Sequence, residues 1–313
     1  MKKSMINKTH IEGYLYSIDK LELRESGPKS KNPGTQFIMG TVNIATDNAC
    51  TNIVPVHFTY VTATTSKGGT NATFGVLKDI VDGKLATVMD KGVDAAAKLR
   101  IDSAIGLNDF YTERDGKEEL VSAKRNEGGF VHTTPSLAED EKVRNTFEAD
   151  MIITGATRVE ANEERNLPEK VVVKGACFNF RNELLPIEFS ATNPNAMNYF
   201  EGLEASPKNP VFTKVWGRQI SETVVRKITV ESAFGEDEVR EVPSSRKDWV
   251  ITGAAKEPYV WDDPSTITAE ELTNAMTARQ TYLATVKQRA DEYKAQRAAG
   301  GSAGAPAAGD FNF

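Results

Sequence analysis

The sequence predicts a mainly β fold, built from two copies of one small barrel and followed by a C-terminal helix and a tail. Two observations lead to this prediction: segments of the first half recur in order in the second half, and apolar residues alternate with period two. The chain has 313 residues and 39% hydrophobic content, which is enough for two domains with cores of their own.

The most specific internal match is an apolar-apolar-Pro-apolar-x-Phe-hydroxyl pattern. It occurs in TNIVPVHFTYVT (51–62) and again in NELLPIEFSATN (182–193). Upstream segments align Gly13 with Gly155 and Gly40 with Gly175, and short helical segments entered through Asn-Ala follow in both copies. Six matches in the same order favour a duplicated domain.

Each copy is expected to contain three strands, a short helix and two further strands. Pro55 and Pro186 cannot donate a backbone hydrogen bond, which places them at an edge or a bulge of the third strand. A helix between the third and fourth of five strands is the layout of the OB-fold, whereas the competing β-sandwich would not require a helix there. In chain order we expect strands at 10–17, 37–44, 51–62, 97–105 and 128–133 with a helix at 71–83, then strands at 152–159, 172–179, 182–193, 213–220 and 247–253 with a helix at 195–205. The predicted barrels are residues 6–134 and 148–257.

A single helix is expected over residues 266–298. Thr268 as N-cap and Glu271 three residues later form a capping box. Five apolar side chains fall on one stripe, which predicts packing against the second barrel or a partner chain. They are Leu272, Met276, Tyr282, Leu283 and Val286.

The last residues, 299–313, are predicted to form a disordered tail. Alanine and glycine bury too little apolar area to offset the entropy of ordering. The chain nevertheless ends in GDFNF, so Asp310, Phe311 and Phe313 are presented to solvent. An aromatic anchor beside a carboxylate suits a pocket with an apolar floor and a basic rim, which predicts a partner-docking peptide.

Composition excludes several classes of protein. No secretory signal or membrane span is recognisable, so we expect a cytoplasmic location without membrane contact. Cys50 and Cys177 give no disulfide framework, and three histidines lack the spacing of a zinc site. Because P-loop and nucleophile-elbow motifs are also missing, we expect neither catalysis nor a cofactor or metal.

Aromatic and basic residues of the first copy predict a nucleic-acid interface. If alternate residues of the strands face the core, the rings of four residues face outward: Tyr14, Tyr16, Phe37 and His57. Cations lie in or near the first loop, at Lys20, Arg24, Lys29 and Lys31. Bases of single-stranded nucleic acid stack on such rings while lysines follow the phosphates. The alternative is that these aromatics cover a barrel end or a domain interface.

The second copy offers different side chains for the same purpose. It either binds nucleic acid as well or mainly mediates homo-oligomerisation. Its candidate binding residues are Arg158, Lys174, Phe178, Phe180, Trp216 and Arg218.

With an OB region, a Gly/Ala/Pro tether and a tip of aspartate and phenylalanine, the chain resembles single-stranded DNA-binding proteins, including phage-type members. The resemblance implies sequence-tolerant protection of single-stranded DNA in replication, recombination and repair, within the cytoplasm of a bacterial host. It also implies that the tip recruits replication or recombination proteins. The alternative is a phage virion or assembly protein built from β domains. A carbohydrate-binding OB module would expect tryptophans on an open face, and the three tryptophans, none of them in the first copy, argue against it.

Overall fold

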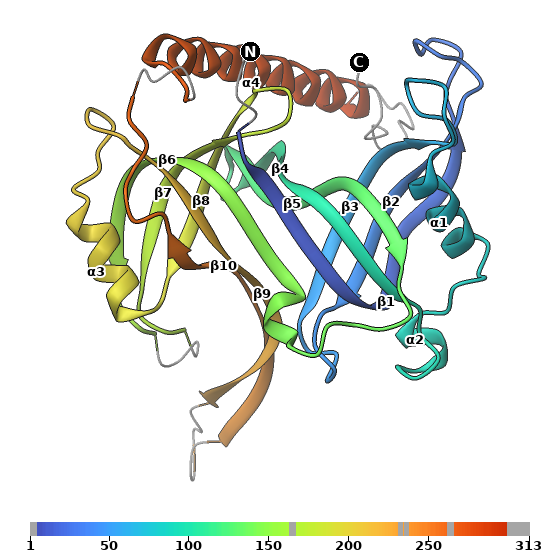
Figure 1. Cartoon of the computed structure of the whole chain (residues 1–313), viewed down its shortest axis with the longest axis horizontal. Helices are drawn as coiled ribbons and strands as arrows, with labels where there is room; N and C mark the ends of the chain where they lie inside the picture. Colours follow the sequence, from blue (N-terminus) through green and yellow to red (C-terminus); the bar gives the residue numbers. More distant parts are fainter. Residues whose placement is uncertain (1–4, 163–166, 231–233, 235–237, 262–265, 299–313) are drawn as a thin grey trace.

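The computed structural model describes residues 5–162, 167–230, 234, 238–261 and 266–298 (Figure 1). The predicted mainly β architecture is confirmed. The chain runs in the order β1 (Asn7–Glu25), β2 (Gln36–Ala45), β3 (Ile53–Thr62), α1 (Ala72–Val81), α2 (Val88–Lys91), β4 (Lys98–Arg114), β5 (Lys117–Thr133), the 3₁₀ turn η1 (Glu141–Val143), β6 (Asn145–Val159), β7 (Lys170–Phe178), β8 (Leu184–Ala191), α3 (Pro194–Gly202), β9 (Val211–Val230), β10 (Glu238–Ala254) and α4 (Ala269–Ala298).

Two rings of strands close on themselves. The first has the order β1-β2-β3-β5-β4 and returns to β1, and the second has the order β6-β7-β8-β10-β9 and returns to β6. In each ring a helix, α1 or α3, separates the third strand from the fourth. The third and fifth strands are parallel and share only a short ladder, which closes the barrel. This is the five-stranded topology of the OB-fold, present twice.

The two barrels are joined edge to edge. The first residues of β1 pair with β4 on one side and with β6 on the other, from Asn7 opposite Ala149 to Ile11 opposite Asn145. All ten strands therefore form one continuous sheet (Figure 1). A buried amide pair reinforces the junction, because Asn126 of β5 and Gln219 of β9 exchange two 2.8 Å hydrogen bonds. The barrels are thus one packed unit.

Each barrel has its own core of inward-facing residues. In the first, Ile11, Leu15, Val42 and Phe58 are fully buried, as alternation predicts. The core of the second includes Ile105 of β4 from the first barrel. The second core is therefore closed partly by a strand of the first copy.

The predicted alignment of the two copies is off by two residues when it is compared with the strand pairing in the structure. Pro55 lies opposite Asn43, and Pro186 lies opposite Ala176. Asn43 is three residues beyond Gly40, but Ala176 is one residue beyond Gly175. Superimposing the prolines therefore does not superimpose these glycines. Both prolines lie on third strands, β3 and β8, which share only a short ladder with the fifth strand of the same barrel. This agrees with the predicted position near a strand edge.

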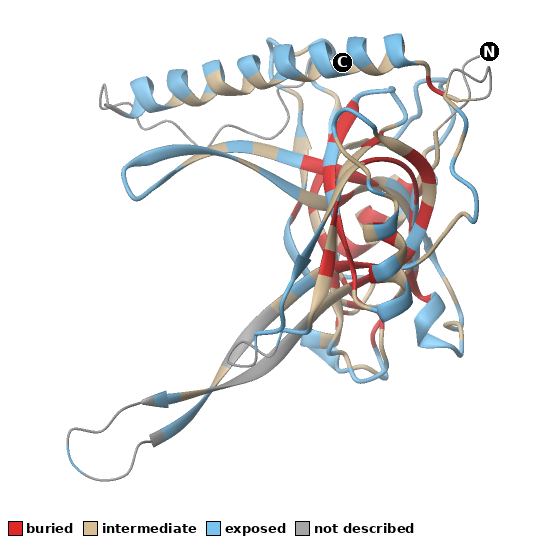
Figure 2. Ribbon diagram, turned by 90° about the vertical axis from the view of Figure 1, so that its left-hand side faces the viewer, coloured by how far each residue is buried: buried red, intermediate tan, exposed pale blue. Residues whose placement is uncertain are grey.

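The C-terminal helix α4 begins with the predicted capping box. The Glu271 N–H donates to Thr268 Oγ1, and the Thr268 N–H donates to Glu271 Oε2, both at 3.1 Å. Leu272 packs on an apolar cluster at one end of the second barrel, as expected, whereas Met276 is exposed. Further along, α4 follows the β4–β5 hairpin. That hairpin and the β9–β10 hairpin extend from the same side of the barrels (Figure 2). Among the described helices, none has the length and apolar character to cross a membrane.

Candidate nucleic-acid interface

The outer surfaces of β5, β4, β1, β6 and β9 form one continuous face across the seam between the barrels. We call it the junction face. One row of directly opposed residues crosses it, in the order Phe130, Asp102, His10, Thr146 and Arg218. A neighbouring row continues from Lys8 through Glu148 to Trp216. Both barrel cores lie behind this face, so its side chains are directed to solvent.

An open cleft of about 400 Å³ lies at the β6–β9 end of the junction face. The Trp216 indole, 38% exposed, forms part of its wall. Arg218 stands two residues further along β9, and Lys142 of η1 contributes a second cation. The remaining lining residues are Thr146, Phe147, Glu148, Gly217 and Thr252. A ring and two cations therefore line one recess.

The backbone of β10 creates the seat for the indole. The β9–β10 register shifts between Ile251 and Gly253, which marks a bulge opposite Trp216. A Cβ atom at Gly253 would overlap the indole ring, so only glycine permits this close approach. Lys214 Nζ lies 6.0 Å from the ring centroid and pairs with Glu148 at 2.9 Å. The ring is thereby held in a fixed orientation.

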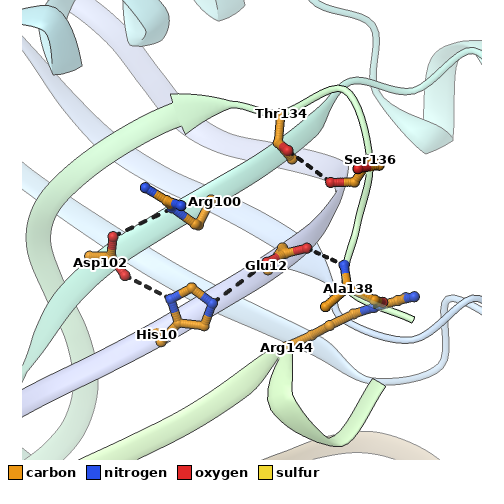
Figure 3. A network of polar contacts seen from close by, with 8 residues as sticks. All are labelled: His10, Glu12, Arg100, Asp102, Thr134, Ser136, Ala138 and Arg144. Atoms are coloured by element: carbon orange, nitrogen blue, oxygen red, sulfur yellow. Dashed lines mark hydrogen bonds and ion pairs between the residues drawn. The ribbon is translucent and has the colours of Figure 1, made fainter. Parts of the chain in front are cut away.

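A polar network occupies the centre of the junction face (Figure 3). His10 Nδ1 lies 2.7 Å from Asp102 Oδ1, and His10 Nε2 lies 3.6 Å from Glu12 Oε2. Arg100 approaches Asp102 at 3.6 Å. On the far side, Glu12 accepts a hydrogen bond from the Ala138 N–H. The Asp102 carboxylate is therefore partly neutralised where it would otherwise repel a phosphate.

The charge of the junction face differs in sign from that of the whole protein. The formal net charge of the chain is −6. The cations of this face are Lys8, Arg100, Lys142, Lys214 and Arg218, and its carboxylates are Glu12, Asp102 and Glu148. Cations thus outnumber carboxylates locally, which favours a polyanion. Within the described part of the chain, no group of histidine, cysteine and carboxylate side chains could hold a metal ion.

The predicted first-copy site is not assembled as one surface. Tyr14 and Tyr16 are half-buried on the outer side of β1. Tyr14 is opposite Ala45 on β2, whereas His57 is opposite Thr41, four residues away on β2 or about 13 Å along the strand. These side chains therefore lie in different regions.

The predicted exposure of Phe37 is wrong. Its side chain is 7% exposed, and its ring lies 4.6 Å from the ring of Tyr60. Alternation correctly places Phe37 on the outer side of β2, but the ring of Tyr60 on the neighbouring strand β3 packs against it. Phe37 is thus a packing residue and not a platform for a base.

The first-loop cations lie on a separate arm. Lys20 is exposed where β1 bends, and Lys29 and Lys31 are exposed in the loop between β1 and β2. Arg24 is ion-paired with Glu22. This arm therefore carries cations on long side chains but no exposed aromatic ring beside them.

In the second copy, two further expectations change. Phe178 is 2% exposed and packs in the cluster beneath α4, so its predicted role as a binding residue is wrong. Arg158 is bound by two carboxylates, those of Glu169 and Glu201, at 2.8 and 2.7 Å. Its cation is already neutralised.

The remaining second-copy candidates divide into two groups. Lys174 pairs with Glu188 at 3.4 Å on β7, and Phe180 is exposed in the β7–β8 loop, so both lie off the junction face. Trp216 and Arg218 are brought together in the cleft. The tip residues Asp310, Phe311 and Phe313 lie outside the described residues.

The sequence analysis identifies Trp216 and Arg218 but not the other residues of the junction face, among them His10, Lys142 and Phe130. His10 and Lys142 were not selected because neither belongs to a recognisable motif. Phe130 was not selected either, although the adjacent Gly128-Gly129 pair signals a bulge. The pairing of β1 with β6, which creates the face, has no signal in the sequence.

Comparisons with known proteins give three findings. A protein-family model described as YorF matches residues 6–289. No curated protein matches the chain. Among solved structures, the chain is similar to a deletion mutant of the single-stranded DNA binding protein from Thermus aquaticus, with 10% identity and a TM-score of 0.46 over 84% of this chain and 99% of that one.

Proposed function

The chain belongs to the YorF family, and we propose that it binds single-stranded DNA without strong sequence preference. The observation that carries the proposal is the cleft in which the half-exposed Trp216 ring stands beside Arg218 and Lys142. The OB topology, which serves oligonucleotide binding in many proteins, is consistent with it but does not by itself specify a ligand.

The chemistry of the cleft suits an unpaired nucleotide. An indole face stacks on any base, because every base has a π-face, and such contacts contribute about 1–3 kcal/mol each. Arg218 and Lys142 provide charge for the flanking phosphates, and phosphate contacts carry no sequence information. A duplex keeps its bases stacked inside and cannot offer one to the ring. The site therefore prefers single strands and tolerates all sequences.

The test is the affinity for fluorescently labelled oligo(dT), followed by anisotropy at several salt concentrations. Trp216→Ala should weaken binding by about 1–3 kcal/mol. Arg218→Ala should weaken binding and also reduce the slope of log K against log salt by about 1. Arg158→Ala is the matched control: its guanidinium is occupied by Glu169 and Glu201, so affinity and slope should stay unchanged. Wild-type protein without salt-dependent binding would refute the function.

We extend this proposal to the biological role and to the tail. The protein protects single-stranded intermediates of phage DNA replication, recombination and repair in the cytoplasm of a bacterial host, and its tip recruits proteins of these processes. Asp310 precedes Phe311 and Phe313, and a carboxylate beside two aromatic rings supports a docking peptide. Truncation after Ala308 should abolish capture of those proteins while DNA affinity stays equal or rises slightly. Retention of every partner by the truncated chain would contradict the recruitment role.

A further inference from the structure

Phe130 is a second exposed ring on the junction face, at the end opposite to Arg218. Its side chain is 70% exposed although it lies within β5. Among the described residues it has no contact with another aromatic ring. A large apolar ring in the middle of a strand, left uncovered by its own chain, is available for stacking with an external ligand.

The backbone is specifically shaped to present this ring. The β4–β5 register shifts between Asp102 and Ala104, where Gly128 and Gly129 form a bulge with φ angles of 64° and 111°. A Cβ atom at Gly129 would overlap the Asp102 carbonyl oxygen. Bulges of this kind redirect the following side chain, here Phe130.

Buried Thr73 of α1 fixes the bulge from the core side. Its Oγ1 accepts a hydrogen bond from the Val131 N–H at 3.2 Å and donates one to the Gly129 carbonyl at 3.4 Å. Thr73 is 4% exposed, so these bonds are sheltered from water. The orientation of Phe130 is therefore determined by the fold and not by chance at a loop tip.

We propose that Phe130 stacks a second base, so that one DNA strand crosses from the second barrel to the first over His10. This inference rests on the proposed function. Phe130 and Arg218 are four strands apart in one row, and Trp216 lies two residues from Arg218, which puts the rings about 20 Å apart along the sheet. A strand whose bases keep the stacked rise of about 3.4 Å per nucleotide covers this distance with about six nucleotides.

The surface between the two rings can follow a phosphate backbone. Lys8 and Arg100 flank the row on either side of His10, and both are exposed. Asp102 lies on the path, but it is held by His10 and approached by Arg100. The path thus runs from one ring to the other over a surface with an excess of cations.

The test compares two lengths of oligo(dT). One of about four nucleotides is too short to reach both rings, and one of about twelve nucleotides is long enough. Phe130→Leu, which keeps an apolar side chain but has no ring, should weaken binding of the long strand about five- to hundred-fold and leave the short strand unaffected. Trp216→Ala should weaken both. Phe180→Leu, an exposed ring off the junction face, is the matched control and should change neither.

Each other outcome has a definite meaning. If Phe130→Leu leaves the affinity for the long strand unchanged, the second stacking position is refuted while the cleft stands. If it weakens short and long strands equally, Phe130 belongs to the same contact as Trp216 and the crossing path is wrong. If Trp216→Ala and Phe130→Leu both leave binding unchanged, the proposed function of this face fails.

Discussion

Arg279 of α4 and Asp109 of β4 form a bidentate ion pair, with Nη1 2.8 Å from Oδ2 and Nη2 2.5 Å from Oδ1. The side chains are 10% and 2% exposed, so the pair is sheltered from water. The Tyr282 ring lies 5.3 Å from the Arg279 guanidinium and covers it. Nearer the hairpin tip, Lys287 and Lys294 both contact Glu118. The C-terminal helix is therefore attached to the long β4–β5 hairpin mainly by charge.

Breaking this pair should destabilise the protein. Because removal of one partner leaves the other charge buried, Arg279→Ala and Asp109→Ala should each lower the free energy of unfolding by about 3–5 kcal/mol. Arg279→Ala/Asp109→Ala should cost less than the sum of the two, as denaturant titration would measure. Lys78→Ala removes the exposed Lys78–Asp82 pair and serves as control, with no measurable change expected. Additive losses would show that the two side chains act independently.

The seat of the Trp216 ring can be tested without changing the ring. Gly253→Ala places a methyl group where the indole lies, so the ring must move and DNA affinity should fall nearly as far as in Trp216→Ala. Gly155→Ala is the control, because a Cβ atom at Gly155 meets no neighbour and this glycine does not lie on the junction face. Anisotropy with oligo(dT) gives the readout, and thermal melting verifies the fold. Full affinity in Gly253→Ala would show that DNA does not use this ring orientation.

Removing a negative charge from the junction face should strengthen DNA binding. Asp102→Asn keeps a hydrogen-bond acceptor for His10 and deletes the carboxylate charge on the path. We expect a several-fold gain in affinity at low salt that shrinks as salt screens it. Asp94→Asn, an exposed carboxylate on the α2–β4 connection, should have no effect. Equal gains in both variants would indicate a nonspecific effect of net charge.

His57 should make the fold acid-sensitive. Burial, together with the nearby Arg125, lowers the pKa of His57 from 6.5 to about 4. Between these two values the unfolded chain binds more protons than the folded one, so the contribution of His57 to stability is complete above pH 6.5 and declines as pH falls toward 4. The His57→Asn variant retains a partner for Thr41 and should lose this dependence. Melting temperatures from pH 7 to 4.5 test it, and parallel profiles of wild type and variant would contradict it.

The local elements of the fold could be predicted from the sequence because local residues determine them. The capping box at Thr268 and the proline-marked third strands depend on near neighbours in the chain. The pairing of β1 with β6 could not be predicted. It depends on which edges of two finished barrels meet, and period-two alternation contains no information about that.

Only part of the candidate site could be predicted, because the sequence pattern determines the side of a strand on which a residue lies but not its tertiary neighbours. Alternation identifies the outer side of a strand but not whether another layer covers it. Phe37 and Phe178 face outward from their own strands, yet Tyr60 covers the first and the α4 cluster covers the second. Trp216 and Arg218 are adjacent on one side of β9 in any register, so their proximity could be read from the sequence. Phe130 required the bulge at Gly129 to be recognised.

The most direct measurement is photo-crosslinking of oligo(dT) to the full-length protein, followed by mass-spectrometric mapping of the modified peptides. The account predicts that the peptide containing Trp216 is the principal adduct, that competition with unlabelled single strands removes it, and that the Arg218→Ala variant reduces it. Adducts confined to the outer surface of β2 and β3, with none on the peptide containing Trp216, would contradict the central claim.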